Sequence, residues 1–451
     1  MQQQNNNRAQ FATRLGVIAT TVGSAVGLGN IWRFPYEAGA HGGGAFLIAY
    51  LCFIFIFGIP ILCAEFMIGR QTRSNIFGAF RKLKPNGHWH HVGYIGIVAS
   101  MMILSFYSVV AGWTMEYLYQ SVTGGLLLAS PSDFDKQFVA FSTNNWRPLM
   151  WTLIFLFVNF LIVIRGVQKG IEKMSNIMMP ILFVILLIFC VNSLLMPGAA
   201  DGLKFLFSPD FSKLNSQVLL GAMGQAFFSL SLGLGTMLTY GSYFSNRTHI
   251  VRSATTTALL DTSVAILAGV IIFPAVFSFG ISPAQGPALV FEILPNIFNQ
   301  LPYSAVWSTL FFFLLFIASL SSTISMSEVT IAFFTEEKKM SRKKATIVNT
   351  AIAMVFGSIC ALSFGILGDF TIAGHTVFSL FDYVSSNILL PLGGMLISFF
   401  AGWLLDRDII RQQLTNQGSF KVYTYKAIIF SLKFIAPTGI LLVFLSSLNL
   451  I

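Results

Sequence analysis

Charged residues are scarce in this chain of 451 residues. The 27 lysines and arginines and 17 aspartates and glutamates make up 10% of the sequence, whereas a soluble domain has about 25%. Apolar residues make up 55%, and the mean hydropathy is +0.75. A water-soluble fold is therefore not expected. The composition instead indicates an integral membrane protein whose outer surface contacts lipid.

Cysteine and histidine are also few. All four cysteines lie inside apolar runs, which is typical of small core residues and not of disulfides in exported loops. The six histidines show no ligand spacing within a span, so we expect that the chain is not an enzyme. The polar residues 2–10 before the first apolar run are unlike a cleavable export signal.

Long apolar runs recur along the chain. A membrane helix needs about 20 mostly apolar residues, and eleven stretches meet this requirement. We expect an all-α integral membrane protein in which residues 1–451 form a single membrane domain of eleven transmembrane helices. The stretches are 12–36, 44–69, 92–123, 148–165, 173–196, 216–243, 253–279, 303–335, 345–366, 374–404 and 424–448.

The basic residues predict the orientation of the chain, because cytoplasmic loops carry an excess of lysine and arginine. With the amino terminus inside, four of the 27 basic residues fall in outer loops and two fall within spans, which leaves 21 for the inner end. We therefore expect a multi-pass protein of the plasma membrane with a cytoplasmic amino terminus and an outer carboxyl terminus. The net charge of +10 is explained by the lipid bilayer and needs no nucleic acid.

One outer loop, 282–302, contains the apolar segment 288–294. We expect this segment to form a short helix that lies over the outer face of the bundle. A freely solvated loop is the alternative, which the apolar content disfavours.

Two of the apolar stretches contain small residues where an unbroken helix would be expected. The first reads Gly23-Ser-Ala-Val-Gly-Leu-Gly-Asn30, and the sixth reads Ser229-Leu-Ser-Leu-Gly-Leu-Gly235. Small residues can simply allow close helix packing. However, the two runs lie five spans apart, an odd number that inverts the second copy. This predicts a five-plus-five inverted repeat over 12–196 and 216–404, with broken helices 1 and 6 and an extra helix at 424–448.

A helix break at mid-membrane depth exposes backbone groups that lipid cannot satisfy, so the break must line a cavity or bind a ligand. Amides near Leu28 and Gly29 favour an anion such as a carboxylate. Carbonyls around Gly23, Ala25 and Val26 favour a small hard cation. Together they indicate a cation-coupled carrier of a carboxylated solute.

Polar residues in other spans are candidates to complete such sites. They are Asn30, Ser229, Asp261 and the cluster Ser319-Leu-Ser-Ser-Thr-Ile-Ser325. An acid inside the membrane is costly and usually functional, although Asp261 near the end of a span could also contact water. Serines can bond back to their own helix, so a packing role for the cluster stays open.

Several longer motifs are more specific. They are Arg14-Leu-Gly, Gly27-Leu-Gly-Asn-Ile-Trp-Arg-Phe-Pro35, Gly42-Gly-Gly-Ala-Phe46, Glu65 before Gly69-Arg70, Gly224-Gln-Ala-Phe-Phe-Ser-Leu-Ser231 and Ala318-Ser-Leu-Ser-Ser322. This set resembles the neurotransmitter:sodium symporters, and in particular the bacterial amino-acid carriers of that family. The resemblance covers roughly the first 400 residues and includes the broken-helix fold.

The resemblance implies two sodium sites with oxygen ligands, which suit a hard cation. The first would comprise the carbonyl of Ala25, Ser229, the side chains of Asn30 and Asp261, and the substrate carboxylate. The second would comprise the carbonyls of Gly23, Val26 and Ala318 and the hydroxyls of Ser321 and Ser322. Because the carboxylate would be a ligand of the first sodium, ion and substrate would bind together.

The resemblance also implies a mostly apolar substrate pocket in which the Tyr107 hydroxyl bonds the carboxylate. Its residues would be Ala25, Leu28, Gly29, Ile103, Tyr107, Phe228, Ser229, Ser231, Leu234, Ser322, Ser325 and Met326. Carriers of amines without a carboxylate have an aspartate at the position of Gly27. Its absence here favours a neutral α-amino acid, with an apolar side chain preferred, as the substrate.

The resemblance also implies two gates, and it bears on whether the protein requires chloride. The implied gates are an outer one formed by Phe228, Arg33 and Asp382, and an inner one formed by Arg8 and Glu336 with Tyr243 and Phe11. Tyr50 and Gln225 resemble parts of the chloride site of animal members. Ala265 stands where that site has a serine, or a glutamate in some bacterial members, so a chloride requirement is doubtful.

The sequence thus predicts a sodium-coupled symporter that imports a neutral amino acid by alternating access, with spans 1, 2, 6 and 7 moving against the rest. A gated channel or a sensor without net transport on the same fold is the alternative. The pattern carries no signal for an oligomeric state.

Overall fold

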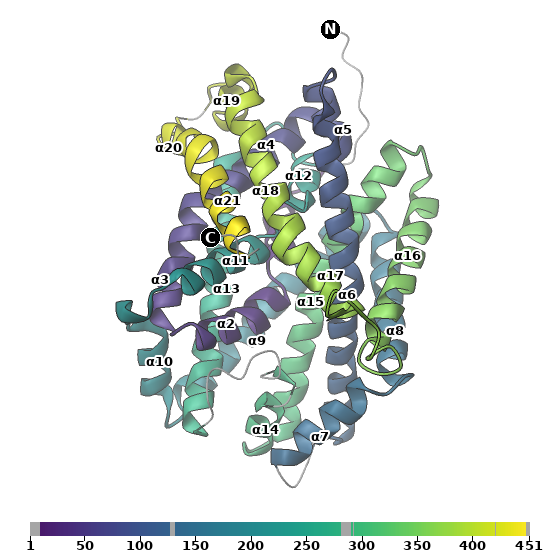
Figure 1. Ribbon diagram of the computed structural model, residues 1–451, viewed down its shortest axis with the longest axis vertical. Coiled ribbons are helices and arrows are strands. Elements are labelled where there is room, and N and C mark those ends of the chain that lie inside the picture. Colours follow the sequence, from purple (N-terminus) through teal and green to yellow (C-terminus); the bar gives the residue numbers. More distant parts are fainter. Residues whose placement is uncertain (1–9, 127–130, 281–289, 292, 420, 448–451) are drawn as a thin grey trace.

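The computed structural model describes residues 10–126, 131–280, 290–291, 293–419 and 421–447. Helices make up nearly all of its regular structure, and many of the long ones run roughly along the vertical axis of Figure 1. One small antiparallel ribbon, in which β1 (Thr371–Ile372) pairs with β2 (His375–Thr376), follows the ninth span.

The described residues contain eight helices that are long and apolar enough to cross a bilayer, or ten if two bent pairs each count as one span. The all-α membrane fold predicted from the sequence is confirmed. The eight are Gly44–Thr72, His88–Thr123, Val167–Leu194, Ile250–Ser278, Ser304–Glu336, Arg342–Leu362, Val377–Leu404 and Tyr425–Leu442. The bent pairs are Arg14–Ala25 with Gly29–Ala40, at 50°, and Lys136–Ser142 with Arg147–Val163, at 70°.

The α-helices within the expected spans are α1 (Arg14–Ala25), α2 (Phe34–Ala40), α3 (Gly44–Phe53), α4 (Ile59–Thr72), α6 (His91–Thr123), α8 (Arg147–Val163), α9 (Lys173–Leu194), α11 (Ser216–Ser229), α12 (Thr236–Gly241), α13 (Ile250–Ser278), α15 (Ser304–Glu336), α16 (Arg342–Leu362), α17 (Val377–Tyr383), α18 (Leu390–Phe399), α20 (Tyr425–Phe430) and α21 (Ala436–Ser447). Shorter helices between the spans are α5 (Ile76–Leu83), α7 (Pro131–Ser142), α10 (Ala199–Phe207), α14 (Ile293–Asn299) and α19 (Arg407–Leu414).

The sixth expected span, 216–243, is interrupted. Helix α11 ends at Ser229 and α12 begins at Thr236, and the residues between them adopt backbone conformations that a helix excludes. Gly233 and Gly235 have φ of +83° and +78°, which glycine adopts readily, and Ser231 has φ of +52°. With α11 and α12 taken as one broken span, all eleven expected stretches correspond to helical segments.

The first span is broken in a comparable way. Its first helix, α1, begins at the cap residue Thr13, whose hydroxyl accepts from the Gly16 amide at 2.9 Å. It ends at Val26, where ψ of 116° turns the chain out of the helix. A π-helical turn at Gly29–Arg33 then leads into α2. Both breaks that the glycine runs predict are therefore present.

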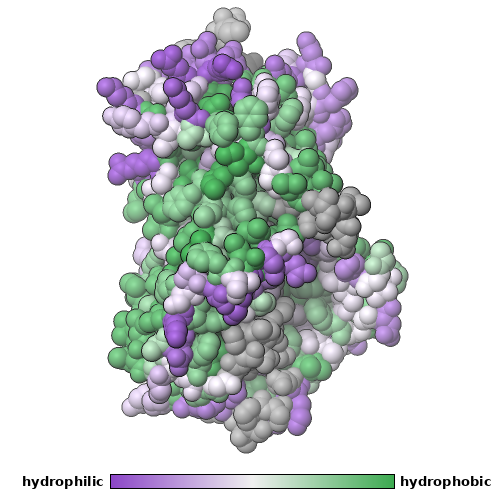
Figure 2. All heavy atoms as spheres, turned by 60° about the vertical axis from the view of Figure 1, so that its left-hand side comes forward, coloured by the Kyte–Doolittle hydropathy of each residue, from purple (hydrophilic) through white to green (hydrophobic). Residues whose placement is uncertain are grey.

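Apolar side chains cover the outside of the bundle. On the face shown in Figure 2, apolar residues occupy the broad middle, and hydrophilic residues gather at the uppermost end. Phe55, Phe157, Val184, Val191 and Val355 are each more than half exposed. Such an apolar surface is compatible with lipid and would be unfavourable in water.

The end that is uppermost in Figure 1, where α5 and α19 lie, carries many of the arginines of the chain. Arg14, Arg81, Arg247, Arg342 and Arg407 are at this end, which we call the basic end. The helices α7, α10 and α14 lie at the opposite end.

The outer loop 282–302 is only partly described. Residues 288, 289 and 292 of the predicted helix at 288–294 lie outside the described residues, and the observed helix in this loop, α14, begins at Ile293. Phe291 is buried and packs edge-on against Trp113 and Tyr117, with ring centroids 5.7 and 5.3 Å apart. This part of the loop is therefore anchored to the bundle, as its apolar content suggests.

Helices α4 and α12 approach each other through their backbones. A Cβ atom placed on Gly69 would lie 2.0 Å from the carbonyl oxygen of Leu238, and one placed on Gly241 would lie 2.7 Å from the Cα of Phe66. No side chain can be inserted at these two points, so the second span is fixed against the second half of the sixth, α12.

The close contact at Gly69 predicts that one added methyl group there destabilises the protein. We expect Gly69→Ala to lower the free energy of unfolding by about 1–3 kcal/mol through overpacking, measured as a lower thermal unfolding midpoint of the purified protein. Gly224→Ala is the matched control, because a Cβ at Gly224 meets nothing within 4 Å. Equal midpoints for the two variants would contradict the close contact.

Candidate functional site

The break in the first span is held by side chains from other spans. The Gly27 amide donates to the Asn30 Oδ1 atom at 3.0 Å, and the Leu28 amide donates to the Tyr107 hydroxyl at 2.8 Å. The Val26 carbonyl accepts from the Ser322 hydroxyl at 3.2 Å. These three backbone groups therefore meet buried polar groups, which a break at mid-membrane depth requires.

A buried carboxylate lies beside this break. Asp261 of α13 is fully buried, and its Oδ1 and Oδ2 atoms accept from Asn30 Nδ2 at 2.7 Å and from the Ser229 hydroxyl at 2.6 Å. Asn30 Nδ2 also lies 3.0 Å from Ser229 Oγ. These three side chains, all predicted as ligands of the first sodium, form one cluster. Among the described residues, no ion pair involves Asp261, so a bound cation would compensate its charge.

A second set of oxygens lies between α1 and α15. The Ser321 hydroxyl is 2.9 Å from the Ala318 carbonyl and 3.3 Å from the Val26 carbonyl, to which Ser322 also donates. Gly23 lies on the preceding turn of α1, against Met179. The structure thus brings together four of the five predicted ligands of the second sodium, Val26, Ala318, Ser321 and Ser322, with oxygen atoms only.

A small cavity lies between the two breaks. Its volume of about 20 Å³ holds about one water molecule, so a solute can enter only after the lining side chains move apart. The residues that line it are Ala25, Gly27, Gly29, Ile103, Tyr107, Phe228, Ser231, Leu234, Ser322, Met326 and Leu390.

Nine of the twelve residues predicted for the substrate pocket line this cavity, and three do not. Leu28 contributes its amide to Tyr107, and Ser229 belongs to the Asp261 cluster. The Ser325 hydroxyl lies 2.9 Å from that of Tyr240. The cavity also includes Leu390, which the sequence did not indicate because it is one apolar residue within an apolar span.

Glycine is required at the break because other groups approach closely. A Cβ on Gly27 would lie 2.4 Å from Ser322 Oγ and 2.6 Å from the Tyr107 hydroxyl, and a Cβ on Gly29 would lie 2.8 Å from Phe228. An aspartate at Gly27, as amine carriers have, does not fit this arrangement.

Two buried polar side chains hold the broken segments in place. The Glu65 carboxylate accepts from the amides of Gly233 at 2.9 Å and Leu238 at 3.2 Å, which belong to the sixth span. Gln225 Nε2 donates to the Gly29 carbonyl at 2.8 Å. The sequence marks Glu65 and Gln225 as parts of motifs, but it assigns neither a role at a break.

Next to the cavity, the Arg33 side chain lies over the ring of Phe228. Its guanidinium carbon lies 4.5 Å from the centre of the Phe228 ring, and its Nε atom lies 3.6 Å from a carboxylate oxygen of Glu37. Asp382 accepts from Ser386 at 2.9 Å. The structure thus records Glu37 as an ion-pair partner of Arg33, and the predicted pair of Arg33 with Asp382 stays a prediction.

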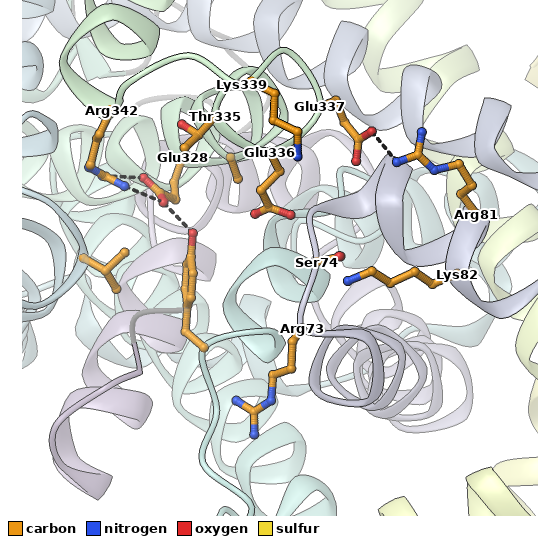
Figure 3. Close-up of a pocket in the computed structure, with 13 residues that line it drawn as sticks. Arg73, Ser74, Arg81, Lys82, Glu328, Thr335, Glu336, Glu337, Lys339 and Arg342 are labelled. Atoms are coloured by element: carbon orange, nitrogen blue, oxygen red, sulfur yellow. Dashed lines mark hydrogen bonds and ion pairs between the residues drawn. The ribbon is translucent and has the colours of Figure 1, made fainter. Parts of the chain in front are cut away.

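Towards the basic end, a pocket of about 500 Å³ contains Glu336 and Tyr243 of the predicted inner gate (Figure 3), whereas Phe11 lines a separate cavity. Glu336 accepts from the Asn75 amide at 2.8 Å, and its predicted partner Arg8 lies outside the described residues. Tyr243 donates to Glu328 at 2.6 Å, and Arg342 pairs with the same carboxylate at 2.7 Å. Tyr243 therefore contacts an acid that the sequence did not single out.

A bundle of membrane helices in which two broken spans meet beside a buried carboxylate, two oxygen clusters and a closed cavity defines the class of secondary transporters with a central ion and solute site. The chain belongs to the sodium:neurotransmitter symporter family, whose model matches residues 8–133 and 137–451. The family predicted from the motifs is thereby confirmed.

Individual relatives support this assignment. The chain is 38% identical to an uncharacterised sodium-dependent transporter, YhdH, of Bacillus subtilis, over 98% of both chains. It is 28% identical to a sodium- and chloride-dependent taurine transporter of Bos taurus, over 89% of this chain and 72% of the relative. The crystal structure of MhsT in complex with L-phenylalanine superposes with a TM-score of 0.91 at 46% identity, over 98% of this chain and 100% of MhsT.

The two oxygen clusters predict a selective loss of sodium binding. We expect Asp261→Ala and Ser322→Ala each to weaken the apparent sodium affinity about tenfold or more, because each removes an oxygen that faces the cation. The measurement is the rise in thermal unfolding midpoint as sodium chloride replaces choline chloride.

Ser319→Ala is the matched control for this experiment, because the Ser319 hydroxyl donates to the Leu315 carbonyl of its own helix at 2.7 Å. It should leave the sodium response unchanged. An equal loss in all three variants would mean that the serines act through packing.

Proposed function

We propose that this protein is a sodium-coupled importer of a neutral amino acid, with an apolar side chain preferred, that works by alternating access. The observation that carries the proposal is the first break, where the Leu28 amide is bonded to the Tyr107 hydroxyl, which lines the cavity, and where Asn30 is bonded to Asp261. MhsT, a structural neighbour, was crystallised with L-phenylalanine.

In the proposed mechanism, the α-carboxylate takes the hydrogen bonds of the Leu28 amide and the Tyr107 hydroxyl. A sodium ion between this carboxylate and Asp261 would be attracted by both buried negative charges. Neither ion is stable in the cavity without the other, so binding of each favours binding of the other. The second sodium, between Val26 and Ser322, fixes α1 against α15.

The apolar lining favours a substrate without a charged side chain. Ile103, Phe228, Leu234 and Met326 surround the cavity and offer no ion-pair partner. Burying a charged side chain among them would cost several kcal/mol, whereas an apolar one gains about 25 cal/mol for each square ångström removed from water.

Alternating access requires that the cavity open to one side at a time. We propose that the basic end faces the cytoplasm, as the distribution of lysines and arginines predicts. Access from outside would then require Phe228 and Arg33 to move, and release inside would require the contacts of Glu328, Glu336 and Tyr243 to separate.

Sodium coupling predicts the ion dependence of transport. In proteoliposomes, uptake of a labelled apolar amino acid against its gradient should fall at least tenfold when choline replaces sodium on both sides. Protein-free liposomes are the control. Uptake that persists without sodium would refute the coupling, and equilibration without accumulation would indicate a channel.

The residues that resemble a chloride site predict that transport does not depend on chloride. The side chains that resemble a chloride site have other partners, because Gln225 bonds to the Gly29 carbonyl and the Tyr50 hydroxyl lies 3.4 Å from Ser229. We propose that ionised Asp261 supplies the negative charge instead. Uptake should therefore stay within about twofold when gluconate replaces chloride, and a larger fall would contradict this assignment.

A further inference from the structure

The charged residues that line a second cavity at the basic end are all basic. The cavity has a volume of about 570 Å³ and lies between the start of α1 and the start of α13. Its lining includes Arg14, Arg247, His249 and Arg252, and it includes no carboxylate among the residues that the structure describes. The pocket in Figure 3 differs in this respect, because three glutamates line it beside its basic residues.

The three arginines of this cavity have no ionic partner within the described part of the chain. The acid that contacts this end of α1, Glu172, is buried and accepts from the amides of Ala12 and Thr13, at 2.9 and 3.2 Å. Within the described part of the chain, Glu172 forms no ion pair with these arginines.

The surroundings of His249 support a strongly positive potential. Burial, together with the charges of Arg252, Arg14 and Arg70, lowers the pKa of His249. Arg70 itself donates to the neutral Thr248 carbonyl at 2.5 Å. A positive charge on the imidazole is thus disfavoured, and a negatively charged ligand would be favoured at the same place.

The cavity also borders the apolar surface of the bundle. Val17 and Ile18 of α1 line it. Leu15 and Leu259 do not line the cavity, but Leu15 follows Arg14 in α1 and Leu259 lies one helical turn after the lining residue Thr256 in α13, and these leucines are 68% and 45% exposed. The arginines therefore lie at the depth where the polar end meets the lipid-facing belt. A soluble anion needs no such apolar border, whereas a lipid headgroup with its acyl chains does.

We propose that this cavity binds the phosphate of an anionic phospholipid headgroup. The planar guanidinium groups of Arg14, Arg247 and Arg252 match phosphate oxygens in pairs. Basic pockets between membrane helices are suited to such headgroups. The acyl chains would lie along Leu15 and Leu259.

Such a ligand would connect two elements. A phosphate held by Arg14 of α1 and by Arg247 and Arg252 at the start of α13 restrains the first half of the broken span against the seventh. This consequence rests on the proposed alternating access, in which α1 must move to open the basic end. Anionic lipid would then stabilise the state in which that end is closed. Binding itself does not depend on transport.

The test uses the full-length protein purified in detergent. Phosphatidylglycerol, compared with phosphatidylcholine, should raise the thermal unfolding midpoint and stay bound in native mass spectrometry. Arg247→Gln with Arg252→Gln should weaken the apparent affinity for phosphatidylglycerol at least tenfold. Both side chains are exposed, so the midpoint without lipid should stay unchanged and show that the variant folds.

The matched control is Arg407→Gln with Arg411→Gln on α19. It removes the same charge from exposed positions of the same end, and it should bind phosphatidylglycerol like the parent. An equal loss in both double variants, or no loss in either, would overturn the site.

A third arm separates the sources of phosphate. Inorganic phosphate and glycerol 3-phosphate should not reproduce the stabilisation at the same concentration. If they do so, with the same dependence on Arg247 and Arg252, the lipid assignment is wrong. Loss of sodium-driven uptake plays no part in these readouts, so failure here and failure of the proposed function are distinguishable.

Discussion

Backbone groups that leave a helix inside a membrane must find partners in the protein, and the rest of this structure depends on that requirement. The first helix of the first span ends at Ala25, and the first helix of the sixth span ends at Ser229. Side chains from other spans form hydrogen bonds with the freed amides and carbonyls. They are Tyr107 from the third span, Glu65 from the second and Ser322 from the eighth. The breaks therefore assemble the centre of the bundle as well as the place where a ligand binds.

The same requirement explains the chemistry of the centre. Oxygen atoms converge on two positions, and one of them includes a carboxylate, Asp261, that no basic residue pairs with in the described structure. In the proposed function, a hard cation and the carboxylate of the neutral amino acid would complete this arrangement with opposite charges.

Much of this organisation could be predicted from the sequence, because lipid imposes long apolar runs and makes every glycine break visible. The eleven stretches and the two breaks follow from such patterns, whereas the grouping of Asn30, Ser229 and Asp261 into one site is implied by the family resemblance. Partner choice at close range could not be predicted. Arg33 pairs with Glu37, four residues away on the same span, and Tyr243 donates to Glu328, which the sequence did not single out. These choices depend on rotamers and on helix rotation, which periodicity does not encode.

The backbone contact of Gly69 with Leu238 has a mechanical consequence. Elsewhere in a bundle, a small shift of one helix is absorbed by the rotamers between it and the next helix. At Gly69 no side chain lies between the two backbones, so α4 and α12 can only move together at this contact. A tilt of the second span would therefore shift the second half of the sixth span, which adjoins the central cavity.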